Sequence, residues 1–143
     1  RMVIDHDDTH DILQNFFIKV WKNLDSFRED SQLYTWLYRI ATNETLTFLN
    51  SKKRRSLLSI DNEYTNLSNK IVADSHFDGN KLEWKLQLAI QKLPEKQRAV
   101  FNLRYYEEMP YEKMSKIFNT SEGALKASYH HAVKKIEHFI LNN

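Results

Sequence analysis

The sequence contains no cysteine and only two glycines and two prolines among its 143 residues. Without cysteine, the chain forms neither a disulfide framework nor a cysteine-based zinc site. Because Gly and Pro make most tight turns, their scarcity argues against a sheet or barrel built on many hairpins. With 41% apolar residues, the composition instead favours an all-α protein whose helices are joined by polar connectors.

Long apolar runs are missing as well. No stretch of the sequence is long enough to span a bilayer, and no secretory signal segment opens it. Together with the lack of cysteine, this fits a reducing compartment, and we expect a cytoplasmic protein. The chain starts at Arg1 and enters a helical pattern within a few residues. We therefore expect the full-length protein to have further residues before Arg1.

Charge is nearly balanced but unevenly distributed. The net charge of +2 is too small to indicate nucleic-acid binding by itself. Acidic side chains dominate between Asp5 and Asp30, whereas basic side chains dominate from Ser31 to Arg55. An acidic surface followed by a basic one in a single module indicates two different partners.

Apolar residues at helical spacing predict two helices in the N-terminal part. The first begins after an Asp-rich turn near Asp5 and ends near Asp25. The second runs from about Gln32 to Ser51 and ends in the basic run 52–55, where cations suit a helix C-terminus. The expected inner faces contain Ile12, Leu13, Phe16, Phe17, Val20, Trp21 and Leu24 in the first helix, and Leu33, Leu37, Ile40, Ala41 and Phe48 in the second.

Residues 55–80 lack sustained periodicity and are rich in Ser, Asn and Asp, which predicts a flexible linker. The chain is thereby divided into two small helical domains at 1–54 and 81–143. The second domain is expected to contain four helices, with breaks at Pro94, Pro110 and the turn 119–121. Its expected inward residues are Leu82, Leu86, Ala89, Ile90, Leu93, Val100, Phe101, Leu103, Tyr106, Met114, Ile117, Phe118, Leu125, Tyr129, Ala132, Val133, Ile136 and Ile140.

The last two predicted helices have the proportions of a helix-turn-helix, in which the first turns of the second helix enter the major groove. Basic side chains there contact phosphates, a carboxylate accepts from a cytosine amino group, and a glycine lets the backbone approach a phosphate. The alternative is an ordinary pair of helices with a solvated polar face. The candidate DNA-binding residues are Glu122, Gly123, Lys126, Ala127 and His130.

A second candidate surface follows the predicted helix at 32–51. Aromatic rings interleaved with Arg and Asn stack on unpaired bases and hydrogen-bond their edges. The alternative for the aromatic residues is ordinary core packing, and for the basic run a solvated helix end. The polar and aromatic stripe consists of Thr35, Trp36, Arg39, Asn43 and Thr47, with Phe27, Tyr34 and Tyr38 close by.

The first predicted helix carries an acidic and amide stripe with an apolar residue in its middle, formed by Asp7, Asp11, Gln14, Ile18 and Lys22. Such a face suits docking on another protein, the alternative being a solvated surface. No nucleophile–base pattern or phosphate loop is present, so we expect a non-enzymatic protein without a cofactor. His6 and His10 lie four residues apart without a third ligand, and we expect no metal site.

Taken in order, these segments resemble the extracytoplasmic-function (ECF) group of bacterial sigma factors, the smallest members of the sigma-70 family. The resemblance covers nearly the whole chain outside the linker. The family's usual additional N-terminal helix is missing here, which agrees with a shortened N-terminus. The matching motifs are Asp8-x-x-Asp11-Ile12-x-Gln14-x-x-Phe17-x-x-x-Trp21, Phe27-Arg28, the run 35–43, Leu93-Pro94-x-Lys96-Gln97-Arg98, Tyr111-Glu112-x-Met114-Ser115-x-Ile117 and the run 121–126.

The resemblance implies a sigma factor that binds core RNA polymerase and directs promoter recognition and melting. It implies docking on the β′ clamp helices by Asp8, Asp11, Gln14, Phe17 and Ile18. It implies binding of the −10 element by Phe27, Arg28, Trp36, Arg39 and Asn43. The C-terminal domain would rest on the β flap and read the −35 element through Ser121, Glu122, Gly123, Lys126, Ala127 and His130.

The resemblance also implies inhibition by an anti-sigma factor, which in many family members is membrane-bound. Two other functions remain open. An autonomous helix-turn-helix regulator would bind operator DNA without polymerase, and a helical adaptor would have no role on DNA. Affinity for core polymerase separates the sigma factor from both, and salt-dependent duplex binding separates the adaptor from the other two.

Overall fold

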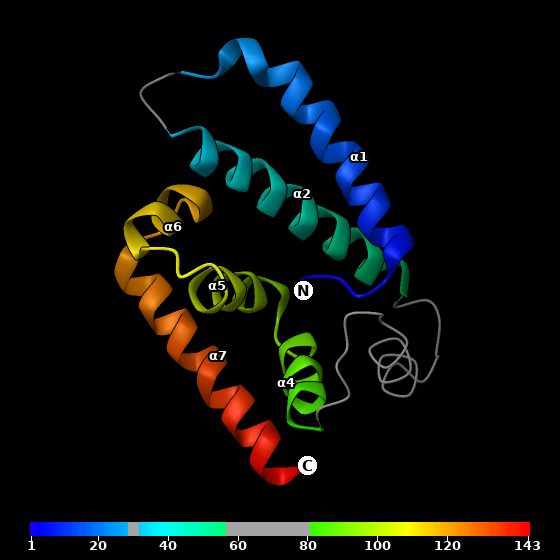
Figure 1. The fold of residues 1–143 in the computed structure, drawn as a ribbon, viewed down its shortest axis with the longest axis vertical. Coiled ribbons are helices and arrows are strands. Elements are labelled where there is room, and N and C mark those ends of the chain that lie inside the picture. Colours follow the sequence, from blue (N-terminus) through cyan, green and yellow to red (C-terminus); the bar gives the residue numbers. More distant parts are fainter. Residues whose placement is uncertain (29–31, 57–80) are drawn as a thin grey trace.

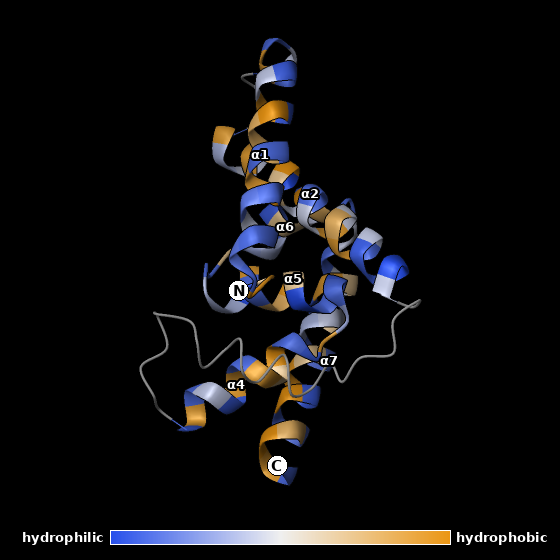
Figure 2. Ribbon diagram, turned by 90° about the vertical axis from the view of Figure 1, so that its right-hand side faces the viewer, coloured by the Kyte–Doolittle hydropathy of each residue, from blue (hydrophilic) through white to orange (hydrophobic). Residues whose placement is uncertain are grey.

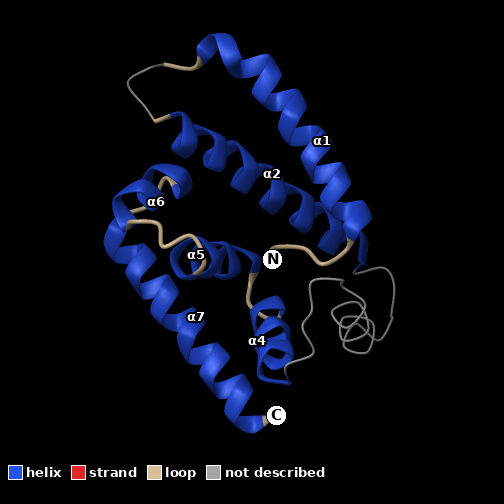
Figure 3. Cartoon of the chain, in the orientation of Figure 1, coloured by secondary structure: helices blue, strands red, loops and turns tan. Residues whose placement is uncertain are grey.

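The computed structural model describes residues 1–28, 32–56 and 81–143, and all of its regular elements are helical (Figures 1 and 3). The all-α prediction is confirmed. The predicted linker lies outside the described residues except for Arg55 and Ser56, which belong to a helix. The elements are α1 (His6–Asn23), the 3₁₀ turn η1 (Leu24–Ser26), α2 (Leu33–Ser56), α4 (Lys81–Gln91), α5 (Glu95–Tyr105), α6 (Tyr111–Phe118) and α7 (Glu122–Asn142).

α1 and α2 form an antiparallel pair (Figure 1). Asp5 caps α1, because its Oδ1 accepts from the backbone N–H of Asp7 (3.0 Å) and of Asp8 (3.3 Å). α2 continues to Ser56, so the basic run 52–55 forms its C-terminal end, as the sequence indicated. Cations in the last turn interact favourably with the helix dipole, which supports this extension.

The prediction of a continuous apolar inner face on α1 was wrong. Of that face, Ile12 is buried and Phe16 and Val20 are half-buried. The rest is largely exposed, because α2 is the helix that packs along α1 and a single neighbour covers only one stripe. The exposed residues are Leu13 (44%), Phe17 (63%), Trp21 (80%) and Leu24 (48%), to which α2 adds Leu33 (51%).

α4 to α7 enclose a well-packed apolar core. α7 packs against α4, α5 and α6, and its half-buried Tyr129 touches both apolar clusters of the core. The predicted core of this module is confirmed except for Leu82, which is exposed in the first turn of α4. The largest fully buried side chains are Leu88, Ile90, Val100, Met114, Ile117 and Leu125.

The helix ends of this module follow local chemistry. Pro94 and Pro110 are the N-cap residues of α5 and α6. Asn119 ends α6 in the left-handed conformation (φ 50°, ψ 50°), which Asn adopts more readily than most residues. The Ser121 hydroxyl caps α7 by accepting from the backbone N–H of Ala124 at 3.2 Å.

The two modules are packed together. α2 contacts both α5 and α6. The segment before α1 reaches the α4–α5 corner, where its backbone oxygens accept hydrogen bonds from Gln91 and Arg98 (Figures 1 and 2). Within the described parts of the chain, no helix is long and apolar enough to cross a membrane.

Candidate functional site

α6, the turn at 119–121 and α7 form the predicted helix-turn-helix, with the first turns of α7 accessible. Leu125 is buried and fixes the inner side of these turns. Gly123 has no heavy atom within 4 Å of the place a Cβ would occupy, so the backbone is open to a ligand. All six predicted residues are exposed on the same end of α7, namely Ser121, Glu122, Gly123, Lys126, Ala127 and His130.

Two further side chains lie next to this surface and were missed in the sequence. The Lys126 ammonium is 5.7 Å from the centroid of the Tyr111 ring, and the Arg104 guanidinium is 4.8 Å from it. Arg104 also donates to the backbone oxygen of Met109 at 3.0 Å. Cations held over an aromatic face are fixed in position. Arg104 lies in the last turn of α5 and Tyr111 begins α6, so their meeting with Lys126 depends on how three helices pack.

A stack of three aromatic rings sets how α7 lies on α5. Phe101 stacks on Tyr129 (centroids 5.8 Å apart) and on Tyr105 (5.1 Å), in both cases with an interplanar angle of 14°. Burial raises the pKa of the Tyr129 phenol. Since α7 carries the candidate DNA-binding residues, the stack orients their surface.

On α2, Arg39 and Asn43 are exposed one turn apart. Trp36 is half-buried and its ring packs against that of Phe27, with centroids 5.1 Å apart. Trp36 therefore takes part in core packing, which was the alternative to base stacking. Arg28 is exposed beside this pair. The remaining members of the predicted stripe differ, since Thr47 is exposed whereas Thr35 is buried and is not available to a ligand.

A buried carboxylate anchors α2 beside the predicted base-binding residues. Glu44 is adjacent to Asn43 in sequence but is buried, and it forms an ion pair with Lys19 of α1. A buried charge is stable only when paired, so Lys19 helps to fix the rotation of α2 about its axis. That rotation leaves Asn43 on the outer side of the helix.

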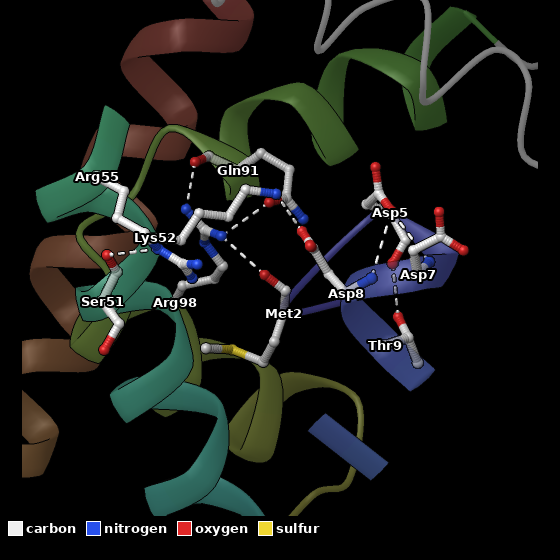
Figure 4. Close-up of polar contacts among 10 residues, drawn as sticks. All are labelled: Met2, Asp5, Asp7, Asp8, Thr9, Ser51, Lys52, Arg55, Gln91 and Arg98. Atoms are coloured by element: carbon white, nitrogen blue, oxygen red, sulfur yellow. Dashed lines mark hydrogen bonds and ion pairs between the residues drawn. The ribbon is translucent and has the colours of Figure 1, made fainter. Parts of the chain in front are cut away.

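The predicted protein-docking face of α1 is accessible at Asp11, Gln14, Phe17 and Ile18. Asp8 differs, because it is half-buried and paired with Lys52 of α2 (Figure 4). Trp21 is highly exposed on the same helix and was expected to be core. The accessible surface of α1 is therefore more apolar than its acidic and amide residues indicated.

Histidines are exposed at both ends of the molecule, including His6, His10, His130 and His131. Among the described residues, no group of three His, Asp or Glu side chains is arranged to hold a metal ion. The His130 and His131 ring centroids are 6.1 Å apart, with an interplanar angle of 60°.

Comparison with known proteins matches both modules to one family. Residues 1–55 match the family profile described as Sigma-70 region 2, and residues 83–136 match Sigma-70, region 4. The ECF RNA polymerase sigma factor SigW of Bacillus subtilis (strain 168) is 33% identical over 138 residues, covering 91% of this chain and 74% of SigW. The ECF RNA polymerase sigma-E factor of Haemophilus influenzae is 30% identical over 145 residues, covering 96% and 77%.

Two solved structures share the fold. The sigma factor RpoE of Bartonella quintana, in complex with the anti-sigma factor NepR, aligns with a TM-score of 0.75 over 99% of this chain and 86% of RpoE, at 21% identity. CnrH, in complex with the cytosolic domain of CnrY, aligns with a TM-score of 0.63 over 97% and 75%, also at 21% identity. The chain therefore belongs to the ECF group of the sigma-70 family, as a non-enzymatic factor that directs RNA polymerase to promoters and initiates transcription.

Proposed function

We propose that the two modules divide promoter recognition between them. The first turns of α7 read the −35 element as duplex, and α2 captures bases of the −10 element as the strands separate. The observation that carries this proposal is the exposed end of α7, which combines small residues with Lys126 and Glu122 and is held on an enclosed apolar core. A rigidly mounted helix end with accessible Lys126 and Gly123 suits the major groove.

α2 presents a surface suited to unpaired bases rather than to duplex DNA. Arg39 and Asn43 supply hydrogen-bonding groups, and the Phe27–Trp36 pair supplies aromatic faces on which a base stacks. Arg28 and the cationic end of α2 favour nearby phosphates. This surface would hold the non-template strand once the duplex opens.

α1 is the proposed docking face for core polymerase. Its accessible Asp11, Gln14, Phe17 and Ile18 combine charge, amide and apolar groups, as protein interfaces do. We assign this face to the β′ clamp helices and the C-terminal module to the β flap. Asp8 contributes at most indirectly, because its carboxylate is paired with Lys52 in α2.

An anti-sigma factor is the proposed inhibitory partner. The solved neighbours RpoE and CnrH are each in complex with another protein, NepR and CnrY, and NepR is named as an anti-sigma factor. We propose that this chain has such a partner, held at the membrane as in many family members, and acts in the cytoplasm where polymerase and promoters are found.

An equilibrium titration with bacterial core RNA polymerase tests the proposal. The wild-type chain should bind tightly, and Asp11→Ala/Gln14→Ala should lose binding. His6→Ala/His10→Ala is the matched control, because both histidines are exposed on the same helix outside the proposed face. Binding that survives in the Asp11/Gln14 variant would move the docking face elsewhere. No binding by the wild type would favour an autonomous helix-turn-helix regulator.

A further inference from the structure

The first helix carries an apolar stripe that is largely uncovered in the described part of the chain. The stripe consists of Leu13, Phe17 and Trp21 of α1 and Leu24 of η1, and Trp21 is the most exposed of them at 80%. Spacings of three and four residues place these side chains on one face. α2 packs along the side of α1 that contains the buried Ile12, and α1 lies at the edge of the molecule (Figure 1). A contiguous exposed apolar surface of this kind indicates a protein partner.

The apolar stripe is symmetric about Phe17. Leu13 lies four residues before Phe17, and Trp21 lies four residues after it. When two copies of α1 lie antiparallel and cross at Phe17, Leu13 of each copy is therefore level with Trp21 of the other. A twofold interface between identical chains needs a surface that is complementary to itself. The spacing of the stripe meets this condition.

The charges beside the stripe favour the same arrangement. Asp11 and Lys22 are both exposed, and they are eleven residues apart, which is about three helical turns, so they lie on the same side of the stripe. Asp11 lies six residues before Phe17 and Lys22 five residues after it. In the antiparallel pair, Asp11 of each copy is thus within about 1.5 Å of the level of Lys22 of the other. A parallel pair would instead bring like charges together, so charge selects the antiparallel order.

We propose that the apolar stripe of α1 is a self-association surface, through which two copies of the chain form an antiparallel dimer centred on Phe17. The 18 residues of α1 make a helix about 27 Å long and about 10 Å wide. A pair of such helices buries much less surface than a standard stable interface, which covers about 1,600 Å² in total. The dimer is therefore weak, with a dissociation constant on the order of tens of micromolar.

The dimer and the complex with polymerase exclude each other, a consequence that rests on the proposed function. Phe17 lies at the centre of the dimer and Asp11 at its edge, and both also belong to the proposed docking face for core polymerase. A copy held in the dimer is therefore closed to polymerase. Because polymerase binds more tightly, it draws copies out of the dimer by mass action. Excess chain is thus stored in a form that does not engage polymerase.

Sedimentation equilibrium from about 1 to about 300 µM tests the dimer. We expect monomer at the lowest concentrations and dimer at the highest. Trp21→Lys should raise the dissociation constant about ten-fold or more, because it places a charge in the stripe. Leu141→Lys is the matched control, since Leu141 is 84% exposed at the end of α7, away from the stripe, and it should leave the dissociation constant unchanged. A wild-type chain that stays monomeric throughout would overturn the dimer, as would equal effects of the two variants.

A charge exchange tests the antiparallel order. Lys22→Glu and Asp11→Lys, each alone, should weaken the dimer about five-fold, because each variant brings like charges together in both halves of the interface. An equimolar mixture of the two variants should associate as tightly as the wild type, since opposite charges then meet in both halves. Sedimentation of one dye-labelled variant with the other unlabelled measures this pairing. A mixture that associates no better than either variant alone would overturn the antiparallel dimer.

Titration of core polymerase into the dimeric chain separates this inference from the proposed function. We expect the dimer to disappear and complexes with one chain per polymerase to form. Complexes with two chains per polymerase would overturn the mutual exclusion. A dimer that forms no complex with polymerase would overturn the proposed docking face and leave the dimer in place. A longer form of the protein that stays monomeric would assign the stripe to its additional residues and overturn the dimer.

Discussion

The C-terminal module is held by an enclosed apolar core, whereas the N-terminal helix pair is not. In α4 to α7, side chains such as Leu88, Val100 and Leu125 are completely or almost completely buried. In α1 and α2, the buried side chains among the described residues are Ile12, Thr35 and Glu44, two of which are polar. Phe17 and Trp21, two of the three aromatic side chains of α1 outside its histidines, are mostly exposed.

This difference teaches how the two modules serve one function. A rigid core suits a module that presents a fixed helix end to duplex DNA, because shape-selective contacts need accurate placement. A helix pair with exposed apolar side chains suits a module that completes its packing on a partner. Before such a partner binds, the ion pairs Lys19–Glu44 and Lys52–Asp8 hold α1 and α2 in register.

The comparison predicts the largest effect in the C-terminal core. Leu125→Ala should cost about 3 kcal/mol of unfolding free energy, because it removes a fully buried side chain and leaves a cavity. Phe17→Ala should cost less than about 0.5 kcal/mol, since that ring is already mostly exposed. Urea unfolding followed by circular dichroism measures both. Equal losses would mean that the N-terminal pair has a core of its own.

The next effect concerns strand opening by the N-terminal module. Asn43→Ala should reduce opening of the −10 region about ten-fold, because it removes exposed hydrogen-bonding groups that we propose contact unpaired bases. Closed-complex formation should change little. Permanganate reactivity of unpaired thymines measures opening, and Asn50→Ala, exposed further along α2, is the control. Unchanged opening would remove Asn43 from the site.

A smaller effect separates folding from DNA contact at Ser121. Ser121→Ala should destabilise the chain by about 1 kcal/mol, because it removes the N-cap of α7. Ser121→Asp should keep the cap and the stability but weaken duplex binding, since a carboxylate is repelled by phosphates. Denaturant unfolding and a duplex titration check the two parts. Normal duplex binding by the Asp variant would place Ser121 outside the DNA interface.

The smallest effect is expected at Lys126. Lys126→Ala should weaken binding to upstream duplex by a few-fold and lower the salt dependence by about one counterion. Binding to core polymerase should be unchanged, because the proposed docking face lies on α1. Lys81→Ala, exposed at the start of α4, is the control. Equal loss of duplex and core binding would contradict the division of labour between the modules.

Much of the candidate site was predictable because it depends on side chains close together in sequence. The exposed residues of α7, from Ser121 to His130, follow from the 3.6-residue repeat once Leu125 and Tyr129 are assigned to the core. Arg104 and Tyr111 were missed because they reach Lys126 only through the packing of α5, α6 and α7. Trp21 was wrongly predicted to be buried, because an apolar side chain indicates burial but the sequence does not show which helix would cover it.

The sequence by itself determined where α1, α6 and α7 begin and where α6 ends. Asp5, Pro110, Asn119 and Ser121 act on backbone groups within a turn of themselves, so their chemistry is enough to place the boundaries. Tertiary structure alone decided that Asp8 pairs with Lys52, that α1 leaves Trp21 exposed, and that Arg98 and Tyr38 join the two modules. These features depend on groups distant in sequence, and which groups meet is decided only when the helices pack.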